Sequence, residues 1–313
     1  MPIIENDPWR MQFFSKVSCP EDVAVPTDDG DAYELFSKYR WVYNKLLIAE
    51  SQGFECGPHG VPPRKFPVFS KPIYNLRGMG SGSLVFQTRE DYSKGLEPGH
   101  FWMPLLSGEH ISSDVAVVDN EAMWWRHVKG KPLEGGMFDY WIIEAEARPD
   151  IEQYCGDWIR RHLKGFTGMI NLETIDNRII ETHLRFSDQW PDLYGSGWLD
   201  ALVELYSNGQ WNFSDRNRRD GFSVVLFGGH GLQYNIVEQE FIDELLKDPE
   251  ISSVQITFHQ DKKPELHAMP PGGFRLAIVN CMNLEAGFKA RERLALHFWS
   301  TQNLKASQVD APQ

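Results

Sequence analysis

Length, composition and charge limit what this chain of 313 residues can be. Hydrophobic residues make up 42% of it and aromatic residues 13%, which is enough for a packed core and excludes a disordered chain. Asp and Glu (44) outnumber Lys and Arg (31), giving a formal net charge of −13, and no basic run offsets it. A phosphate backbone would be repelled, so we expect no nucleic-acid partner.

Cysteine spacing and hydropathy indicate the compartment. The four cysteines lie far apart without a C-x-x-C pair, at Cys19, Cys56, Cys155 and Cys281. This spacing fits neither a disulfide framework nor a zinc ribbon, and it suits a reducing compartment. The first residues lack the apolar stretch of a signal peptide, and no apolar run approaches the roughly 20 residues of a membrane span. We therefore expect a cytoplasmic protein with no membrane partner.

The first part of the chain predicts a mixed α and β architecture. The acidic segment Thr27–Asp31 predicts a helix cap, and Tyr33–Gln52 predicts one or two amphipathic helices that end at Gly53. A Pro/Gly-rich passage then excludes helix. The elements expected next are strands at Phe66–Pro72, Ser83–Gln87, Ile111–Asp119 and Tyr140–Ala147, a helix at 151–164, a β-hairpin at Gly168–Phe186 and a helix at Trp198–Tyr206.

A polar stretch after residue 207 predicts a linker, and residues 221–313 predict a compact α+β unit of their own. Its expected elements are strands at Phe222–Phe227, Ser253–Phe258 and Phe274–Asn280 and helices at Gln239–Lys247 and Leu284–Trp299. The predicted organisation is thus an N-terminal segment (1–40), a central region (41–207) and this C-terminal unit.

The hairpin carries the most informative cluster, because Glu173, Glu181 and His183 are three potential metal ligands within eleven residues. Side chains alternate across a strand, so their convergence depends on the loop length. A three-residue loop (176–178) places Glu173 opposite Glu181 and Asn171 opposite His183. One face then holds Asn171, Glu173, Glu181, His183 and Arg185, and the other holds Ile170, Leu172, Ile180, Leu184 and Phe186. A two-residue Asp-Asn turn is locally plausible but would scatter both sets, so the pattern favours the odd loop.

Two opposed carboxylates repel each other unless a cation lies between them. Carboxylate oxygens suit Mg²⁺, which fills the rest of its shell with water and substrate phosphates. The alternative interpretation is a hairpin face whose charges simply point to water, which is the ordinary place for these residue types.

A glycine-rich loop lies between two predicted strands in Lys71–Ser83, where Gly78, Gly80 and Gly82 alternate with Met and Ser. Such a loop can bring backbone N–H groups against phosphates. It matches neither the Walker pattern nor the Rossmann pattern. Lys71 ends the preceding strand, within reach of the same phosphates.

Taken in order, these segments resemble the ATP-grasp superfamily over roughly Tyr39–Tyr194. The resemblance rests on YNKLLIAESQGFECGP, FPVFSKP, GMGSGS, HFWMPLLSGEHISSDVAVVD and NLETIDNRIIETHLR, five segments in that family's order. It implies an α+β ATP-grasp fold, two lobes that clasp the nucleotide, with a small C-terminal α+β unit.

The resemblance also implies roles for individual residues. The ATP phosphates would be contacted by Lys45, Lys71, Gly78, Gly80 and Gly82. Adenine would meet the backbone of Phe101, Trp102 and Met103, and the ribose would meet Glu109. Mg²⁺ would be bound by Glu173 and Glu181, and phosphate or substrate would be acted on by Arg185 and Arg126. His183 stands where the family has asparagine, so as a ligand it would supply nitrogen instead of oxygen and make Mn²⁺ an alternative metal.

The implied function is an ATP-dependent ligase that activates a small-molecule or peptide carboxylate as an acyl phosphate for attack by an amine. The alternatives are an ATP-grasp phosphotransferase and a nucleotide-binding protein without turnover. The N-terminal segment is too short for the domain that usually helps hold the acceptor. We therefore expect the acceptor to lie against the C-terminal unit or against a second subunit of a homodimer.

Overall fold

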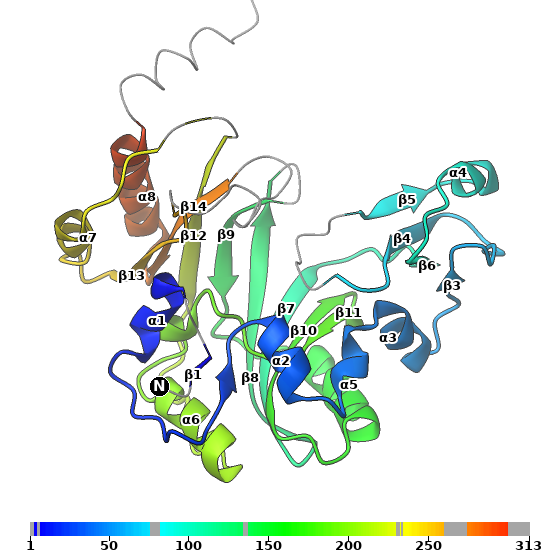
Figure 1. The fold of residues 1–313 in the computed structure, drawn as a ribbon, viewed down its shortest axis with the longest axis horizontal. Coiled ribbons are helices and arrows are strands. Elements are labelled where there is room, and N and C mark those ends of the chain that lie inside the picture. The colour runs from blue at the N-terminus through cyan, green and yellow to red at the C-terminus, as the bar shows by residue number, and fades with distance from the viewer. Residues whose placement is uncertain are drawn as a thin grey trace, which may run out of the picture.

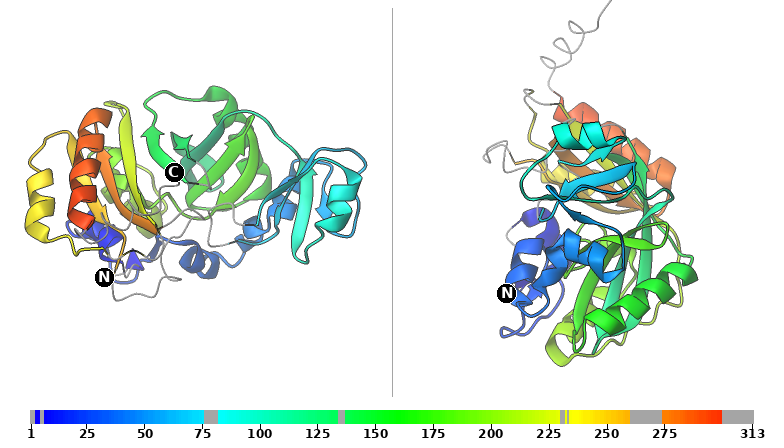
Figure 2. Two further views of the ribbon diagram at one scale, coloured as in Figure 1. Left: turned by 90° about the horizontal axis from the view of Figure 1, so that it is seen from above. Right: turned by 90° about the vertical axis from the view of Figure 1, so that its right-hand side faces the viewer.

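The protein was analysed as a computed structural model, which describes residues 3–4, 7–75, 82–133, 137–229, 232, 234–259 and 274–299. Figure 1 shows a large twisted sheet that forms the body, and a small sheet that extends from it as an arm. The two further views in Figure 2 show the arm standing apart from the body, with helices packed against the large sheet.

The large sheet has eight strands in the order β11-β10-β7-β8-β9-β12-β14-β13, and all the neighbours are antiparallel. Its strands are β7 (His110–Val118), β8 (Glu121–Pro132), β9 (Phe138–Ile143), β10 (Gly168–Ile175), β11 (Arg178–His183), β12 (Gly221–Gly228), β13 (Ile251–Ile256) and β14 (Phe274–Cys281). Because β12 pairs with β9, the strands after residue 220 continue the central sheet. The predicted C-terminal unit therefore shares this sheet with the central region.

The small sheet has the order β3-β6-β4-β5 and consists of β3 (Gly57–Pro58), β4 (Val68–Pro72), β5 (Leu84–Phe86) and β6 (His100–Pro104). Helix α4 (Arg89–Lys94) packs Tyr92 against Phe86 and Trp102 on one face of it. A capping box at Thr88 and Asp91 fixes the start of α4. The other face carries Phe69 and Lys71 toward the body of the protein.

Two helices cover one face of the large sheet and one covers the other. Helix α5 (Pro149–His162) buries Trp158 and Ile159 against the first face. Helix α8 (Leu284–Phe298) approaches the same face at Gly287, where an added Cβ would lie 2.5 Å from the sulfur of Cys281. Helix α6 (Trp198–Asn208) packs Trp198 into the aromatic cluster of the opposite face.

The N-terminal segment crosses that opposite face in Figure 1, where α1 (Pro8–Phe14) and α2 (Asp29–Leu35) are drawn in blue. Strands β1 (Ile3–Ile4) and β2 (Val25–Pro26) pair in parallel. The predicted helical stretch is divided among α2, η1 (Arg40–Tyr43) and α3 (Lys45–Ser51), since Asn44 caps a new helix. The expected stop at Gly53 is confirmed by its φ of 77°. The remaining short elements are η3 (Pro191–Leu193) and α7 (Gln239–Leu245).

The β10–β11 hairpin has the predicted register but not the predicted loop. Glu173 lies opposite Glu181 and Asn171 opposite His183. The turn, however, has only two residues, Asp176 and Asn177, with φ of 51° and 59°. These angles belong to the tight turn that suits the twist of a hairpin.

A β-bulge restores the parity that the short turn would have changed. Thr174 pairs with Ile179 and Glu173 with Glu181, so Ile180 is an extra residue in β11. Consequently Ile180 does not lie in the predicted apolar set but faces a cavity, and Ile179 takes its place in the core. Phe186, which lies beyond the end of β11, packs in the cluster of the opposite face and not with Leu184.

No helix within the described ranges is both long and apolar enough to cross a membrane.

Candidate functional site

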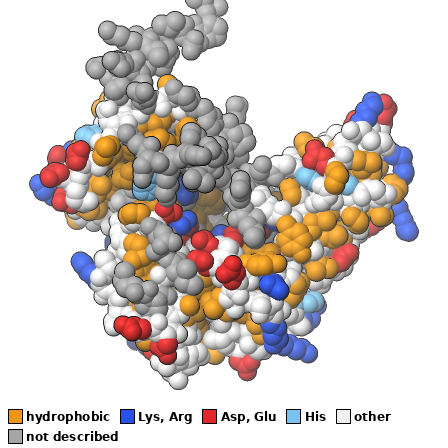
Figure 3. Space-filling model, in the orientation of Figure 1, with side chains coloured by type: hydrophobic (Ala, Val, Ile, Leu, Met, Phe, Trp, Pro, Cys, Tyr) orange, Lys and Arg blue, Asp and Glu red, His pale blue; other side chains and the backbone are white. Residues whose placement is uncertain are grey.

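A cavity of about 400 Å³ lies between the two sheets, a size typical of small-molecule sites. Side chains from four parts of the chain line it: Lys45 from α3, Lys71 from the small sheet, Glu173 and Glu181 from the hairpin, and Arg275 from β14. Figure 3 shows side chains of both charge signs beside the hollow between the body and the arm. The structure thus brings together the lysines and the carboxylates that the sequence predicted.

Two lysines hold the hairpin edge. Lys45 Nζ lies 2.7 Å from Glu181 Oε1, and Lys71 Nζ donates a hydrogen bond of 2.6 Å to the carbonyl of Ile180. The bulge accounts for that bond, because it leaves the extra residue outside the strand ladder. Burial lowers the pKa of Lys71 to about 8; Glu181 opposes this shift and Lys45 adds to it. Lys71 is therefore a buried cation that faces the cavity and has no carboxylate of its own among the described residues.

Glu173 is paired with a histidine that the sequence did not suggest. His110 Nε2 lies 3.0 Å from Glu173 Oε2. Burial alone would raise the pKa of Glu173, but His110 and further cations hold it well below its ordinary value. The same contact outweighs burial at His110 and raises its pKa. His110 begins β7 and meets Glu173 only because β7 pairs with β10, a neighbour relation that sequence spacing does not reveal.

Asp29 is a second residue that the sequence did not assign to the site. His183 Nδ1 lies 3.0 Å from Asp29 Oδ1, and Arg185 Nε lies 3.0 Å from the same oxygen. Burial would raise the pKa of Asp29, but Arg185 and His183 lower it well below its ordinary value. The sequence indicated a cap in this acidic segment, which Asp28 provides, whereas Asp29 faces the site. Arg185 lines the cavity with its charge already paired.

The metal ligands predicted in the hairpin are only partly assembled. His183 Nε2 lies 3.6 Å from Glu181 Oε1 and 3.9 Å from Glu173 Oε1, so all three side chains converge. Burial would lower the pKa of His183, but Asp29 raises it above its ordinary value, and metal ligation, which needs the neutral ring, is disfavoured to that extent. Within the described ranges, no group of three or more His, Cys, Asp or Glu side chains is arranged to hold a metal ion. The role of His183 as a ligand stays a prediction.

The structure does not bring Arg126 to the cavity. Its buried guanidinium lies 3.0 Å from Asp215 Oδ1 and donates to the carbonyl of Tyr194. The indole N–H of Trp124 also donates to Asp215. Arg126 shares a sheet face with the hairpin carboxylates but lies toward α6, where aromatic side chains close the surface. It acts there as half of a buried ion pair.

The residues predicted to meet adenine and ribose lie beside the cavity and do not line it. Phe101, Trp102 and Met103 are buried in β6, and their backbone pairs with β4 and β3. Glu109 is half-exposed and contacts Lys129 and Arg148. Their assigned contacts stay predictions.

Part of the glycine-rich loop is described. Gly82 has a φ of 78°, which favours glycine, and Ser83 lines the cavity. Gly78 and Gly80 lie outside the described residues.

The far wall of the cavity comes from β9, from the C-terminal strands β12 and β14 and from the loop after the hairpin, and it combines apolar and polar side chains. Phe138, Trp141, Val225 and Phe227 supply apolar surface, and Gln189 and Arg275 supply polar groups. The expectation that an acceptor lies against the C-terminal part named no residue there, because the pairing of β12 with β9 is not visible in the sequence.

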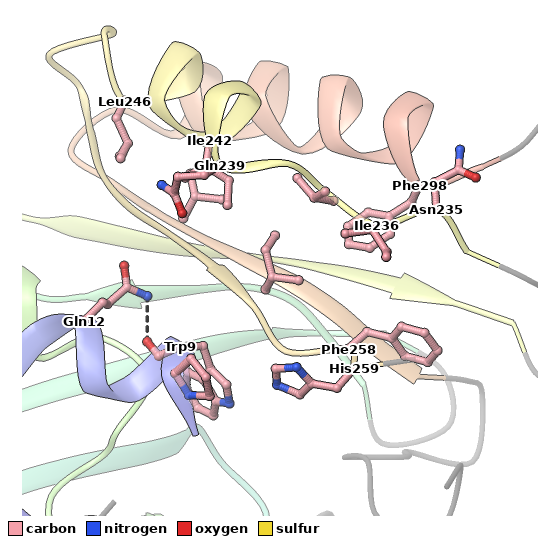
Figure 4. Close-up of a pocket in the computed structure, with 14 residues that line it drawn as sticks. Trp9, Gln12, Asn235, Ile236, Gln239, Ile242, Leu246, Phe258, His259 and Phe298 are labelled. Atoms are coloured by element: carbon pink, nitrogen blue, oxygen red, sulfur yellow. Dashed lines mark hydrogen bonds between the residues drawn. The ribbon is translucent and has the colours of Figure 1, made fainter. Parts of the chain in front are cut away.

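A second cavity of about 600 Å³ lies among α1, α7, β13 and the end of α8. Figure 4 shows Trp9, Ile242 and Phe258 around it, with Gln12 bonded to the carbonyl of Trp9. The described residues that line it include no Asp, Glu, Lys or Arg. It therefore lacks the charge that a phosphate or carboxylate ligand requires.

A Ser-His-Glu row lies on the other face of the sheet. Ser113 Oγ is 2.8 Å from His127 Nδ1, and His127 Nε2 is 3.1 Å from Glu152 Oε1. Ser113 and His127 are completely buried, so this hydroxyl is not accessible to a substrate. The row cross-links β7, β8 and α5.

Comparison with solved structures identifies the fold class. An L-amino acid ligase from Bacillus licheniformis superposes with a TM-score of 0.61 at 13% identity, covering 92% of this chain and 82% of that one. A phosphoribosylamine–glycine ligase from Thermotoga maritima gives 0.61 at 14% identity, covering 90% and 84%. A carboxyaminoimidazole ribonucleotide synthase from Aspergillus clavatus, complexed with ATP, gives 0.59 at 13% identity, covering 87% and 82%.

These superpositions confirm the predicted α+β ATP-grasp fold. No protein-family model matches the sequence, and no curated protein matches it either. The likeness is therefore one of tertiary structure.

Proposed function

We propose that this protein is an ATP-dependent ligase that activates a carboxylate as an acyl phosphate and transfers it to an amine, releasing ADP and phosphate. The fold supports this, since the three similar structures are ligases or synthases and one is a complex with ATP. The observation that carries the proposal is the pair Glu173 and Glu181, which share one sheet face under Lys45 and Lys71 at the cavity.

The donor set at the hairpin fits Mg²⁺. Glu173 and Glu181 offer carboxylate oxygens, and these are the protein ligands that Mg²⁺ prefers. His110 and Lys45 now lie against these two carboxylates, and a bound metal ion would add its positive charge at the same oxygens. Glu173 and Glu181 would hold the ion, and the ion would neutralise phosphate charge. Mn²⁺ is the alternative if His183 joins them.

The remaining chemistry is positioning and charge stabilisation, as in other phosphoryl transfers. Lys71 is placed to bind phosphate, because its buried ammonium donates to a carbonyl and forms no ion pair with any described carboxylate. Lys45 holds Glu181 in place and supplies a second positive charge. Arg185, fixed by Asp29, presents a preorganised guanidinium for the acyl phosphate.

The substrates would be small-molecule or peptide carboxylates and amines. The proposed compartment is the cytoplasm, since all four cysteines are free thiols and suit a reducing environment. The homodimer expected from the sequence stays a prediction.

The test is turnover of ATP with panels of carboxylates and amines, followed by phosphate release and by mass spectrometry of the product. Phosphate release that requires both an amine and a carboxylate supports the ligase. A stable phosphorylated product would instead support a phosphotransferase. Tight ATP binding without turnover across the panels would support a binding protein and contradict the ligase.

A further inference from the structure

The charges around the cavity do not balance at one wall. Each cavity carboxylate has a basic partner: Lys45 lies beside Glu181 and His110 lies beside Glu173. Two cavity cations, Lys71 and Arg275, have no carboxylate partner among the described residues. Lys71 lies on the wall from the small sheet, where phosphates are expected. Arg275 lies on the wall from β14.

Arg275 is placed to receive an anion. Its Nη1 donates a long hydrogen bond of 3.4 Å to Gln189 Oε1, and its Nε is buried without a hydrogen-bond partner. The carboxylate of Asp188 does not make this pair, because Arg10 binds it. Burial lowers the pKa of Arg275, although Asp188 opposes that shift. A buried guanidinium that is not hydrogen-bonded to a carboxylate destabilises a fold, so a ligand that supplies such a carboxylate would be favoured here.

The support behind Arg275 is rigid. Trp9 lies under its guanidinium, 5.3 Å from the ring centre. The backbone carbonyl of Gln189 accepts hydrogen bonds from Gln255 and Asn280 at 2.8 and 2.9 Å, and the side-chain amide of Gln189 donates one to Ser223. These contacts fix the loop that carries Gln189, so a carboxylate would meet a preformed site.

Apolar side chains lie next to this cation. Phe227 is the register partner of Arg275, and Val225 lies on the same face of β12. Phe138 and Trp141 pack with ring centres 4.1 Å apart and line the same cavity. The wall therefore matches a ligand with a carboxylate at one end and an apolar body.

We propose that the amine substrate itself carries a carboxylate, which Arg275 binds, and an apolar side chain, which the Phe138–Trp141–Val225–Phe227 surface binds. An apolar α-amino acid has this chemistry. The inference rests on the proposed ligase for its place in a reaction, but binding at Arg275 can be measured without nucleotide.

The experiment compares L-phenylalanine with L-phenylalaninamide, in which a neutral amide replaces the carboxylate. Binding to the full chain is measured by ligand-detected NMR titration, for the wild type and for Arg275→Gln, Arg275→Lys and Arg64→Gln. We expect phenylalanine to bind and the amide to bind at least tenfold more weakly. Arg275→Gln should weaken phenylalanine about 10- to 100-fold, the range for losing hydrogen bonds to a charged group.

The two remaining variants separate charge from geometry. Arg275→Lys keeps the positive charge but not the two-pronged donor, so an intermediate loss is expected. Arg64 is 90% exposed and makes only a loose, exposed pair with Glu55 among the described residues, so loss of its charge should leave binding unchanged. Arg275→Lys also retains a readout if Arg275→Gln fails to fold.

Three outcomes would overturn the inference: no binding of phenylalanine to the wild type, equal binding of acid and amide, or unchanged binding in Arg275→Gln. Stabilisation by Mg²⁺ and ATP is measured on the same samples. If ATP fails to stabilise the wild type while the acid–amide difference persists, the ligase proposal fails and the carboxylate site stands.

Discussion

Two arginines on the same face of the large sheet have opposite surroundings. Arg126 is completely buried, and Asp215 from the loop after α6 neutralises it. Arg275 faces the cavity, and the nearby Asp188 is already bound by Arg10. The same residue type thus serves the fold where the chain supplies its carboxylate. Where no described carboxylate bonds to the arginine, as at Arg275, we propose that a ligand supplies the carboxylate.

The two ends of this face differ in the same way. Around Arg126, Trp124, Trp198 and Phe213 pack in one aromatic cluster. Around the hairpin carboxylates a cavity remains, and their cations come from distant elements. The difference indicates that charge pairs near α6 stabilise the fold and that those near the small sheet prepare a binding site.

The largest predicted effect is loss of stability in Asp215→Ala. Removing this carboxylate leaves Arg126 buried and unpaired, which should cost about 3–5 kcal/mol. Urea unfolding measures the free energy. The matched variant is Arg275→Met, which leaves no buried charge unpaired and should cost far less. A larger loss in Arg275→Met than in Asp215→Ala would contradict the comparison.

The next effect concerns ligand binding at the hairpin. With Mg²⁺ and ATP at 100 times the dissociation constant, the wild type should gain about 2.7 kcal/mol. Glu181→Gln should lose most of this gain, because a neutral amide is a poor metal ligand and no longer pairs with Lys45. Thermal shift with and without ligand checks this. Glu90→Gln breaks an exposed Lys–Glu pair in α4 and should keep the full ligand gain.

A smaller effect should appear in the pH dependence of ATP binding. The pKa of Lys71 is lowered to about 8, so its ammonium is present below this pH and lost above it. If phosphate binds the charged form, affinity should be constant to about pH 7 and fall about tenfold by pH 9. Lys71→Arg stays charged over this range and should show a flat profile. Parallel titration curves for the two proteins would argue against a phosphate contact by Lys71.

The smallest effect concerns the hairpin turn. Asn177 has a φ of 59°, which asparagine and glycine adopt more readily than other residues. Asn177→Ala should therefore lower the free energy of unfolding by about 1 kcal/mol, whereas Asn177→Gly should leave it equal or slightly higher. Urea denaturation of both variants checks the sign. Equal losses in the two would mean that the side chain of Asn177, and not its backbone angle, stabilises the turn.

The hairpin shows how far sequence patterns reach. Alternation of apolar and charged residues fixed which side chains had to share a face, and the register of Glu173 with Glu181 followed from it. The loop length did not follow, because a short turn with a bulge and a longer turn without one produce the same parity. Ile180 therefore faces the cavity instead of the predicted apolar face, and its carbonyl accepts a hydrogen bond from Lys71.

By itself the sequence determined the order of most helices and strands and the sorting of the hairpin faces, because these depend on residues near one another along the chain. Only the tertiary structure decided the contacts that Asp29, His110 and Arg275 make at the site, and which carboxylate pairs with Arg126. Each of these contacts joins segments that meet through strand order or through the path of the N-terminal segment across the sheet. Ion pairs form wherever folding brings opposite charges together, and the local hydrophobic periodicity does not predict which distant charged residue will be the partner.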